Sequence, residues 1–230
     1  KFNEPYLSKI INQEIFEDDI YQKHFKVNEN DIVLDVGANV GAFSYKALKE
    51  NPKKVYSIEP SNLLLPTLEK NLSNFDNKEI INYRLADNNF KSNKVNYNDE
   101  IHIYDNSGAT YDNIKFNELI EKYNINKIDF LKCDCEGGEY FIFNKENKEW
   151  INKNVKHIAA EFHLWGVPAA LDSFYIFRDL YLQDKENFIV ETREGKDVSK
   201  HMDDDQWLKD FSWGERTRAQ LNVYIKDGRK

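Results

Sequence analysis

Short apolar runs alternate with amphipathic segments along most of the chain, and this alternation constrains the fold more than any other feature. Six runs have the length and composition of buried strands, at residues 32–36, 55–59, 80–85, 128–133, 158–164 and 188–192. Helical patterns separate most of them. Alternating strands and helices build a parallel sheet with helices on both faces, joined by right-handed crossovers. The sequence therefore predicts a doubly wound α/β fold.

Three stretches depart from simple alternation. Residues 1–30 place apolar side chains at near-helical spacing and predict an N-terminal helical cap ahead of one domain over residues 31–230. Residues 87–115 are rich in Asn, Asp and Ser, and predict an inserted hairpin or loop with short strands at 95–97 and 101–104. No convincing crossover helix separates 188–192 from 221–225, so these two strands are expected to pair antiparallel.

Composition excludes several classes of partner. The chain has 40 acidic and 32 basic residues, and its net charge of -8 disfavours nucleic-acid binding. No apolar run is long enough to predict a membrane span. Cys133 and Cys135 flank a single residue, where a disulfide would be strained, so we expect free thiols and a reducing, cytoplasmic compartment. The chain begins with Lys1 and not Met, and we expect that upstream residues were removed.

The sharpest local motif runs from a buried strand through a glycine turn into a helix, over residues 32–44. Gly37 lets the backbone turn sharply, and Gly41 permits close packing of the helix on the strand. A dinucleotide fingerprint has glycine where this chain has Asn39, which disfavours NAD. A ligand with an amino-acid end, a ribose and an adenine but no phosphate fits better, namely S-adenosylmethionine. Asp35 would face its amino-acid portion.

An acidic residue at the end of the second strand strengthens this interpretation. Glu59 follows Asp35 by 59 − 35 = 24 positions, near the spacing expected for an acid that accepts both ribose hydroxyls. We predict that Gly37, Asn39, Gly41 and Glu59 contact the cofactor. Asp87, after the third strand, is a candidate for the adenine, although a polar residue opening a loop is equally typical there. The alternative is that the glycines only make a turn, with Glu59 a solvated strand end.

The fourth strand has an unusually polar end for a buried strand. Strand alternation places Lys132 and Asp134 on one face, so we expect Asp134 at the carboxyl edge, beside the cofactor. Glu136 follows in the turn, and glycines at 137 and 138 let the backbone come close to a ligand before a helix near Glu139.

Alternation on the fifth strand places Glu161 and His163 on one face. A histidine beside a carboxylate is a natural general base for a hydroxyl group, and the alternative is a hydrogen-bonded structural histidine. We predict a catalytic group made of Asp134, Glu161 and His163. Asp134, Glu136, Glu161 and His163 are also potential ligands for a divalent metal such as Mg²⁺, although they form no compact ligand motif.

Together these motifs resemble the FkbM-type family of S-adenosylmethionine-dependent methyltransferases, of the class I Rossmann-like fold. The resemblance rests on residues 33–41, 58–60, 128–139 and 161–163. It implies a seven-stranded sheet that is mostly parallel with a reversed last strand, and O-methylation of a hydroxyl on a sugar or other small molecule. Aromatic residues beyond residue 163 could form a wall for a sugar ring, namely Trp165, Tyr175, His201, Trp207 and Trp213.

Two rival functions remain open on the residues alone. One is a non-catalytic module that keeps the fold to bind S-adenosylmethionine or a partner, although the polar ends of the fourth and fifth strands argue against it. The other is an NAD-dependent oxidoreductase, which Asn39 disfavours.

Overall fold

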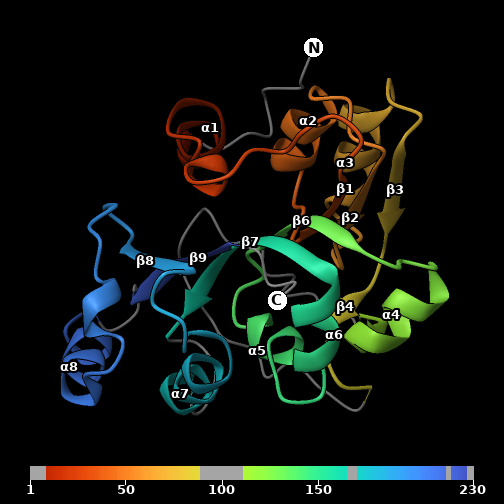
Figure 1. Ribbon diagram of the computed structural model, residues 1–230. Helices are drawn as coiled ribbons and strands as arrows, with labels where there is room; N and C mark the ends of the chain where they lie inside the picture. Colours follow the sequence, from red (N-terminus) through yellow and green to blue (C-terminus); the bar gives the residue numbers. More distant parts are fainter. Residues whose placement is uncertain (1–8, 89–110, 165–169, 216–218, 227–230) are drawn as a thin grey trace. The chain divides into compact units, whose positions relative to one another are not determined.

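A computed structural model of the chain describes residues 9–88, 111–164, 170–215 and 219–226. Its main sheet has seven strands in the order β3-β2-β1-β6-β7-β9-β8. The last strand, β9 (Gln220–Lys226), runs antiparallel to both β7 (Val155–His163) and β8 (Phe188–Thr192). These features confirm the predicted Rossmann-like α/β fold with a reversed last strand. The chain divides into two compact units, residues 1–115 and 116–230, which are described in turn (Figure 1).

The first unit is built on three parallel strands, β1 (Ile32–Val36), β2 (Lys54–Ile58) and β3 (Lys78–Ile81). Helix α2 (Ala42–Leu48) follows β1 and contacts both β1 and β2, and α3 (Leu65–Leu72) contacts α2. Three short helical segments precede the strands, at α1 (Lys9–Asn12), the π-helix η2 (Gln13–Glu17) and the 3-10 helix η3 (Ile20–Gln22). The described part of the N-terminal stretch therefore contains short helical segments up to Gln22, and a separate cap over residues 1–30 stays a prediction.

The third predicted strand is interrupted, which corrects the expectation of one strand over residues 80–85. β3 ends at Ile81, and β4 (Arg84–Leu85) pairs instead with β5 (Asn113–Ile114) in a separate two-stranded sheet. Asn82 explains the break, because its side-chain amide donates hydrogen bonds to the carbonyl oxygens of Glu59 and Pro60, both at 3.0 Å. The short strands expected at 95–97 and 101–104 lie outside the described residues.

The second unit holds β6 (Ile128–Cys133), which pairs parallel with β7, and the antiparallel strands β9 and β8. Its helices are α4 (Phe116–Lys122), α5 (Glu139–Ile142), α6 (Lys148–Asn154), α7 (Ala170–Tyr181), η4 (Ser199–His201) and α8 (Asp205–Glu215). Among the described residues, no helix is long and apolar enough to cross a membrane.

Helix α8 corrects the sequence analysis, which expected no clear helix between β8 and β9. Asp204 immediately before it accepts a hydrogen bond from the backbone N–H of Trp207 at 2.9 Å, as an N-terminal cap does. Trp207, Leu208 and Phe211 recur at helical spacing, and Leu208 is fully buried. The antiparallel pairing of β8 with β9 is nevertheless as predicted.

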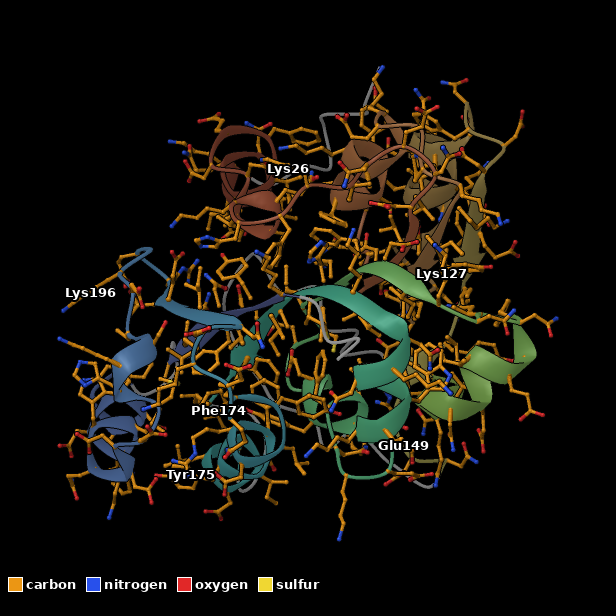
Figure 2. All side chains as sticks on the ribbon, viewed as in Figure 1. Lys26, Lys127, Glu149, Phe174, Tyr175 and Lys196 are labelled. Atoms are coloured by element: carbon orange, nitrogen blue, oxygen red, sulfur yellow. The ribbon has the colours of Figure 1, made fainter. Side chains whose placement is uncertain are left out.

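An aromatic cluster forms the core on one face of β7. Phe162 stacks on Phe177 with ring centroids 3.9 Å apart, and Phe143 and Phe174 lie within 6 Å of these rings. Figure 1 shows α5, α6 and α7 on the same side of the strands of this unit. Figure 2 labels Phe174, which is buried, beside Tyr175, whose hydroxyl instead reaches the carbonyl oxygen of Asp205 at the start of α8. The opposite face of these strands carries the polar side chains described below.

Gly41 provides a test of how the glycine turn is built. It caps α2 with φ of +85°, and a Cβ there would lie 2.6 Å from Cδ1 of Leu68. We expect Gly41→Ala to lower the free energy of unfolding by about 2 kcal/mol, measured by urea denaturation, because it adds both backbone strain and a steric clash. The control is Gly214→Ala in α8, where no described atom outside its own stretch of helix lies within 4 Å of the new Cβ. Equal stability changes in the two variants would contradict this explanation.

Candidate active site

The glycine loop, residues 37–41, is held to the end of β2 by backbone hydrogen bonds. The N–H groups of Gly37 and Ala38 both donate to the carbonyl oxygen of Ile58, at 3.0 and 2.9 Å. Gly37, Asn39 and Gly41 have φ angles of 76°, 52° and 85°, which is the left-handed region. The loop therefore leaves β1 in a tight turn whose shape depends on two glycines and an asparagine.

Glu59 fixes this loop from the adjacent strand end. Its Oε2 accepts a hydrogen bond from the backbone N–H of Asn39 at 2.9 Å, and its Oε1 accepts one from that of Ser61 at 2.8 Å. The side chain is buried, with 6% of the residue exposed. A carboxylate has about four acceptor positions, more than these two N–H groups fill. Glu59 is thus an oriented acceptor of the kind that would fit two ribose hydroxyls.

Asp35 is fully buried and takes part in a hydrogen-bond chain. Its Oδ2 accepts a hydrogen bond from the Ser44 hydroxyl at 2.7 Å, and Ser44 Oγ lies 2.7 Å from Ser57 Oγ. The chain ties β1 to α2 and β2, so this carboxylate orients the structure beneath the glycine loop. A direct contact of Asp35 with a cofactor stays a prediction.

Asp87 lies in the loop after β4 and is exposed. Its Oδ1 is 3.7 Å from Nζ of Lys115, a surface ion pair. The structure does not bring it together with the other predicted residues of the first unit through any described contact, and its role at an adenine stays a prediction.

In the second unit, a tight turn follows β6. Glu136 and Gly137 have φ angles of 56° and 95°, so two consecutive residues are left-handed. The turn brings the side chain of Glu139 back onto the chain, where its Oε1 accepts hydrogen bonds from the N–H groups of Cys135 and Gly137 at 3.1 and 3.2 Å. A Cβ on Gly138 would lie 2.9 Å from Cys135 Sγ, which explains why glycine fits there.

His163 at the end of β7 lies among carboxylates from this turn and from its own strand. Its Nδ1 is 3.1 Å from Glu139 Oε1, and its Nε2 is 3.1 Å from Glu161 Oε1 and 3.3 Å from Glu136 Oε2. Only 3% of its side chain is exposed. We call these residues, together with Asp134, the carboxylate–histidine cluster. An oxygen of Asp134 lies within 4.8 Å of ligand atoms of Glu136 and His163, so the structure brings together the four predicted residues of the second unit.

Burial opposes a charge on His163, but the surrounding carboxylates outweigh it. Burial lowers the pKa of His163, whereas the negative charges of Glu139 and Glu136 raise it, so that the pKa lies well above 6.5. Both ring nitrogens face carboxylate oxygens, which is the geometry that a doubly protonated imidazolium satisfies. An imidazolium has no lone pair with which to take a proton. The geometry thus favours His163 as a hydrogen-bond donor to Glu161 in this state.

Glu161 is the carboxylate of the cluster with the clearest electrostatic perturbation. Burial raises its pKa, the negative charge of Asp134 raises it further, and the hydrogen bond from His163 acts in the opposite direction. A carboxylate of raised pKa is a stronger base than one in water. It is therefore able to receive a proton from a hydroxyl group.

The predicted metal site has only partial geometric support. Ligand atoms of Asp134, Glu136 and His163 lie within 4.8 Å of one another, and Glu161 is not part of that group. Both nitrogens of His163 already face carboxylate oxygens, so a metal would have to replace a proton held by those contacts. Metal binding stays a prediction, and no step below depends on it.

The two cysteines are free thiols, as predicted, with their Sγ atoms 3.6 Å apart. Burial raises the pKa of Cys133, and the hydrogen bond with Cys133 together with burial raises the pKa of Cys135 well above its usual value. Thiols held in the protonated form are poor nucleophiles, so the structure gives neither a nucleophilic role.

Sequence reasoning missed two residues that orient the cluster. Glu139 was placed only at a helix start, because strand alternation does not show that a left-handed turn returns its side chain to His163. Tyr140 donates a hydrogen bond from its hydroxyl to the carbonyl oxygen of His163 at 2.9 Å, and burial raises its pKa well above 10. The signal available for both was the Gly-Gly pair directly before them.

The proposed aromatic wall is assembled only in part. The His201 ring stacks on Trp207, with centroids 4.6 Å apart, and Trp207 stacks on Phe211. Trp213 is 73% exposed, and Trp165 lies outside the described residues. Sugar stacking on these rings stays a prediction.

Comparison with known proteins places these motifs in a family context. A model of the methyltransferase FkbM domain matches residues 35–185, well over half of the chain. No curated protein gives a significant sequence match.

Three solved structures illustrate the structural likeness. Precorrin-8w decarboxylase from Methanobacterium thermoautotrophicum is 15% identical, over 86% of this chain and 82% of that chain, with a TM-score of 0.44. An rRNA methylase from Streptococcus thermophilus is 13% identical over 87% and 89%, with a TM-score of 0.47. A precorrin-6y C5,15-methyltransferase from Geobacter metallireducens is 11% identical over 87% and 81%, with a TM-score of 0.43. Similarities of this size support no inference about function. Function is inferred from the family match alone.

The charge of Glu139 can be removed while its shape is kept. In Glu139→Gln, the amide oxygen can still accept the two backbone N–H groups, but the negative charge beside His163 is lost. We expect the pKa of His163 to fall, measured by NMR titration of the imidazole in the presence of EDTA. The control, Glu121→Gln, changes an exposed residue of α4. An unchanged pKa of His163 in Glu139→Gln would show that the imidazolium is held by other groups.

Proposed function

Since the chain belongs to the methyltransferase FkbM domain family, we propose that it transfers the methyl group of S-adenosylmethionine to a hydroxyl oxygen of a small molecule or sugar. The family makes it a methyltransferase and implies S-adenosylmethionine as the methyl donor. The observation that carries the choice of a hydroxyl acceptor is Glu161, a buried carboxylate of raised pKa whose Oε1 lies 3.1 Å from Nε2 of His163. A hydroxyl must lose its proton when its oxygen is methylated, and such a carboxylate can receive it.

The residues of the first unit fit the cofactor by their acceptor chemistry. Glu59 is oriented by two backbone N–H groups, and its carboxylate is an acceptor of the kind that ribose hydroxyls need. Gly37, Asn39 and Gly41 shape the loop that would lie against the nucleoside and amino-acid parts. S-adenosylmethionine, when bound, supplies a methyl group on a positively charged sulfur, which a nucleophilic oxygen can displace directly.

The residues of the carboxylate–histidine cluster divide the acid–base work. Glu161 receives the proton of the acceptor hydroxyl as its oxygen attacks the methyl group. His163 donates a hydrogen bond to Glu161 and fixes its orientation, while the charge of Asp134 raises the proton affinity of Glu161. In this proposal the base is Glu161. His163, which the sequence predicted as the base, orients Glu161 instead. Holding the acceptor in a fixed geometry supplies much of the remaining acceleration.

The rival functions are a non-catalytic module on the same fold and an NAD-dependent oxidoreductase. A module without catalysis would have no need to bury the carboxylates of Glu139 and Glu161 beside a buried histidine, which is costly to stability. In the oxidoreductase, pyrophosphate would approach the loop where Asn39 projects a side chain. Both rivals are outcomes of the first experiment.

Calorimetric titration with S-adenosylhomocysteine tests the cofactor. We expect saturable binding by the wild-type chain and at least tenfold weaker binding by Glu59→Ala, because two hydrogen bonds to a charged acceptor are lost. The control is Glu79→Ala, whose residue pairs with Lys54 on the surface of the same unit. NAD is titrated in parallel, and we expect no binding.

Each other outcome of this titration favours a rival. Binding of NAD without S-adenosylhomocysteine would favour the oxidoreductase. If neither S-adenosylhomocysteine nor NAD binds, the methyltransferase proposal is overturned. Equal binding by Glu59→Ala and wild type would leave the cofactor in place but remove Glu59 from its site.

Replacing Glu161 tests the proton acceptor. We expect Glu161→Gln to lower kcat for a hydroxylated acceptor by about 10²- to 10⁴-fold and to leave the affinity for S-adenosylhomocysteine unchanged. Turnover is measured with and without Mg²⁺. Glu149→Gln is the control, because Glu149 is exposed on α6 (Figure 2). Near-normal turnover in Glu161→Gln would exclude this residue as the base.

A further inference from the structure

A row of polar side chains crosses three strands of the second unit, starting at Glu161. In the sheet register, Glu161 on β7 lies directly opposite Asn222 on β9, and Asn222 lies directly opposite Glu191 on β8. Directly opposed residues of neighbouring strands project from the same face. The three side chains therefore form one row, perpendicular to the strands, on the face away from the Phe162 cluster.

All three members of the row are withdrawn from solvent. Glu161, Asn222 and Glu191 are 7%, 6% and 5% exposed. Polar side chains are seldom buried to this extent in the middle of a sheet unless they have partners or a ligand to bind.

One acceptor atom in this row has no partner among the described residues. Oδ1 of Asn222 is buried and accepts no hydrogen bond from any residue that the structure describes. Leaving such an atom unpaired costs stability, whereas an apolar residue of similar shape would carry no such cost. In the ligand-free protein, Oδ1 of Asn222 is therefore a destabilising group next to Glu161. A hydrogen-bond donor on a bound ligand would fit this position.

Tyr224 lies beside this row, on the same face of the sheet. It lies opposite Ala159 and Ile189 on the same face, one register step further along the strands. Burial raises the pKa of Tyr224, and the negative charges of Glu191 and Glu161 raise it further. The small side chain of Ala159 leaves β7 without bulk beside this tyrosine.

We propose that Asn222 and Glu191 form an acceptor subsite that binds a second hydroxyl group of the methyl acceptor, beside the hydroxyl whose proton Glu161 receives. This inference rests on the proposed function and names its specificity determinants. The row offers hydrogen-bond acceptors, namely two carboxylates and an amide oxygen, so it fits O–H donors. Neighbouring strands are about 4.8 Å apart, which sets the spacing of the two hydroxyls that the row can bind.

The charge of the row predicts which acceptors are rejected. Two buried carboxylates repel an anion, and the cation described beside them, the His163 imidazolium, already faces the carboxylates of Glu139 and Glu161. A hydrocarbon with a single hydroxyl would leave Oδ1 of Asn222 unpaired. The subsite thus selects an uncharged polyol, such as a sugar ring, over a uronate and over a simple alcohol.

Thermal unfolding of the ligand-free chain is the first test. Asn222→Leu keeps the branching and the number of side-chain heavy atoms, and removes the unpaired acceptor. We expect its melting temperature to rise by about 2 to 4 °C, as for a group kept for binding at the expense of stability. The matched control is Thr192→Val, which removes another buried acceptor, Oγ1, from the opposite face of β8; this atom also has no partner in the described parts of the chain.

Methyl transfer is the second test, with methyl β-D-glucopyranoside and methyl α-L-rhamnopyranoside as polyol probes, benzyl alcohol as the single-hydroxyl probe and D-glucuronate as the anionic probe. We expect wild type to prefer a polyol probe. Asn222→Leu should raise the KM for that probe about tenfold with little change in kcat, whereas Thr192→Val should change neither. Glu191→Gln should reduce the discrimination against D-glucuronate, because it removes one of the repelling charges.

The outcomes separate this inference from the proposed function. A chain that fails to bind S-adenosylhomocysteine overturns the proposed function itself. A chain that binds it but methylates no polyol probe, or prefers benzyl alcohol, overturns the subsite alone. A fall in the melting temperature of Asn222→Leu would likewise overturn the subsite, because Asn222 would then be a structural residue.

Discussion

A buried histidine among carboxylates is the interaction on which the second unit depends. His163 is almost completely enclosed, and both of its ring nitrogens face carboxylate oxygens. Removing one partner of such a buried charged group is strongly destabilising, because the remaining charge is left without compensation. The strand ends and the turn after β6 must therefore keep their positions for the cluster to exist. The left-handed backbone at Glu136 and Gly137 follows from this requirement, since it directs Glu139 back to the imidazole.

In the first unit, the glycine loop is held mainly by backbone N–H groups and less by side chains. These N–H groups donate to Ile58 and to the carboxylate of Glu59. The polar row of β7, β9 and β8 consists instead of side chains, which can be changed without altering the strands.

The sequence was informative where a local pattern determined the structure. Alternation on β7 placed Glu161 and His163 on one face, where they contact each other, because side-chain direction in a strand follows from its period of two. The glycine loop was equally predictable, since Gly37 and Gly41 directly after a buried strand indicate a tight turn. Prediction failed where a side chain acted on a distant backbone. The Asn82 amide ends β3 through contacts with residues more than twenty positions earlier, and nothing near Asn82 in the sequence indicates this.

The buried row also could not have been found from the sequence, for a different reason. Glu161, Asn222 and Glu191 are far apart along the chain, and only the antiparallel register of β9 with both neighbours brings them opposite one another. A shift of one residue in that register would turn Asn222 onto the aromatic face, where an amide could not be accommodated. The register is in turn fixed by the apolar residues of β9, which alternate with Asn222 and pack on the other face with Phe162. The hydrophobic core of the second unit thus determines, through strand register, which polar groups stand beside Glu161.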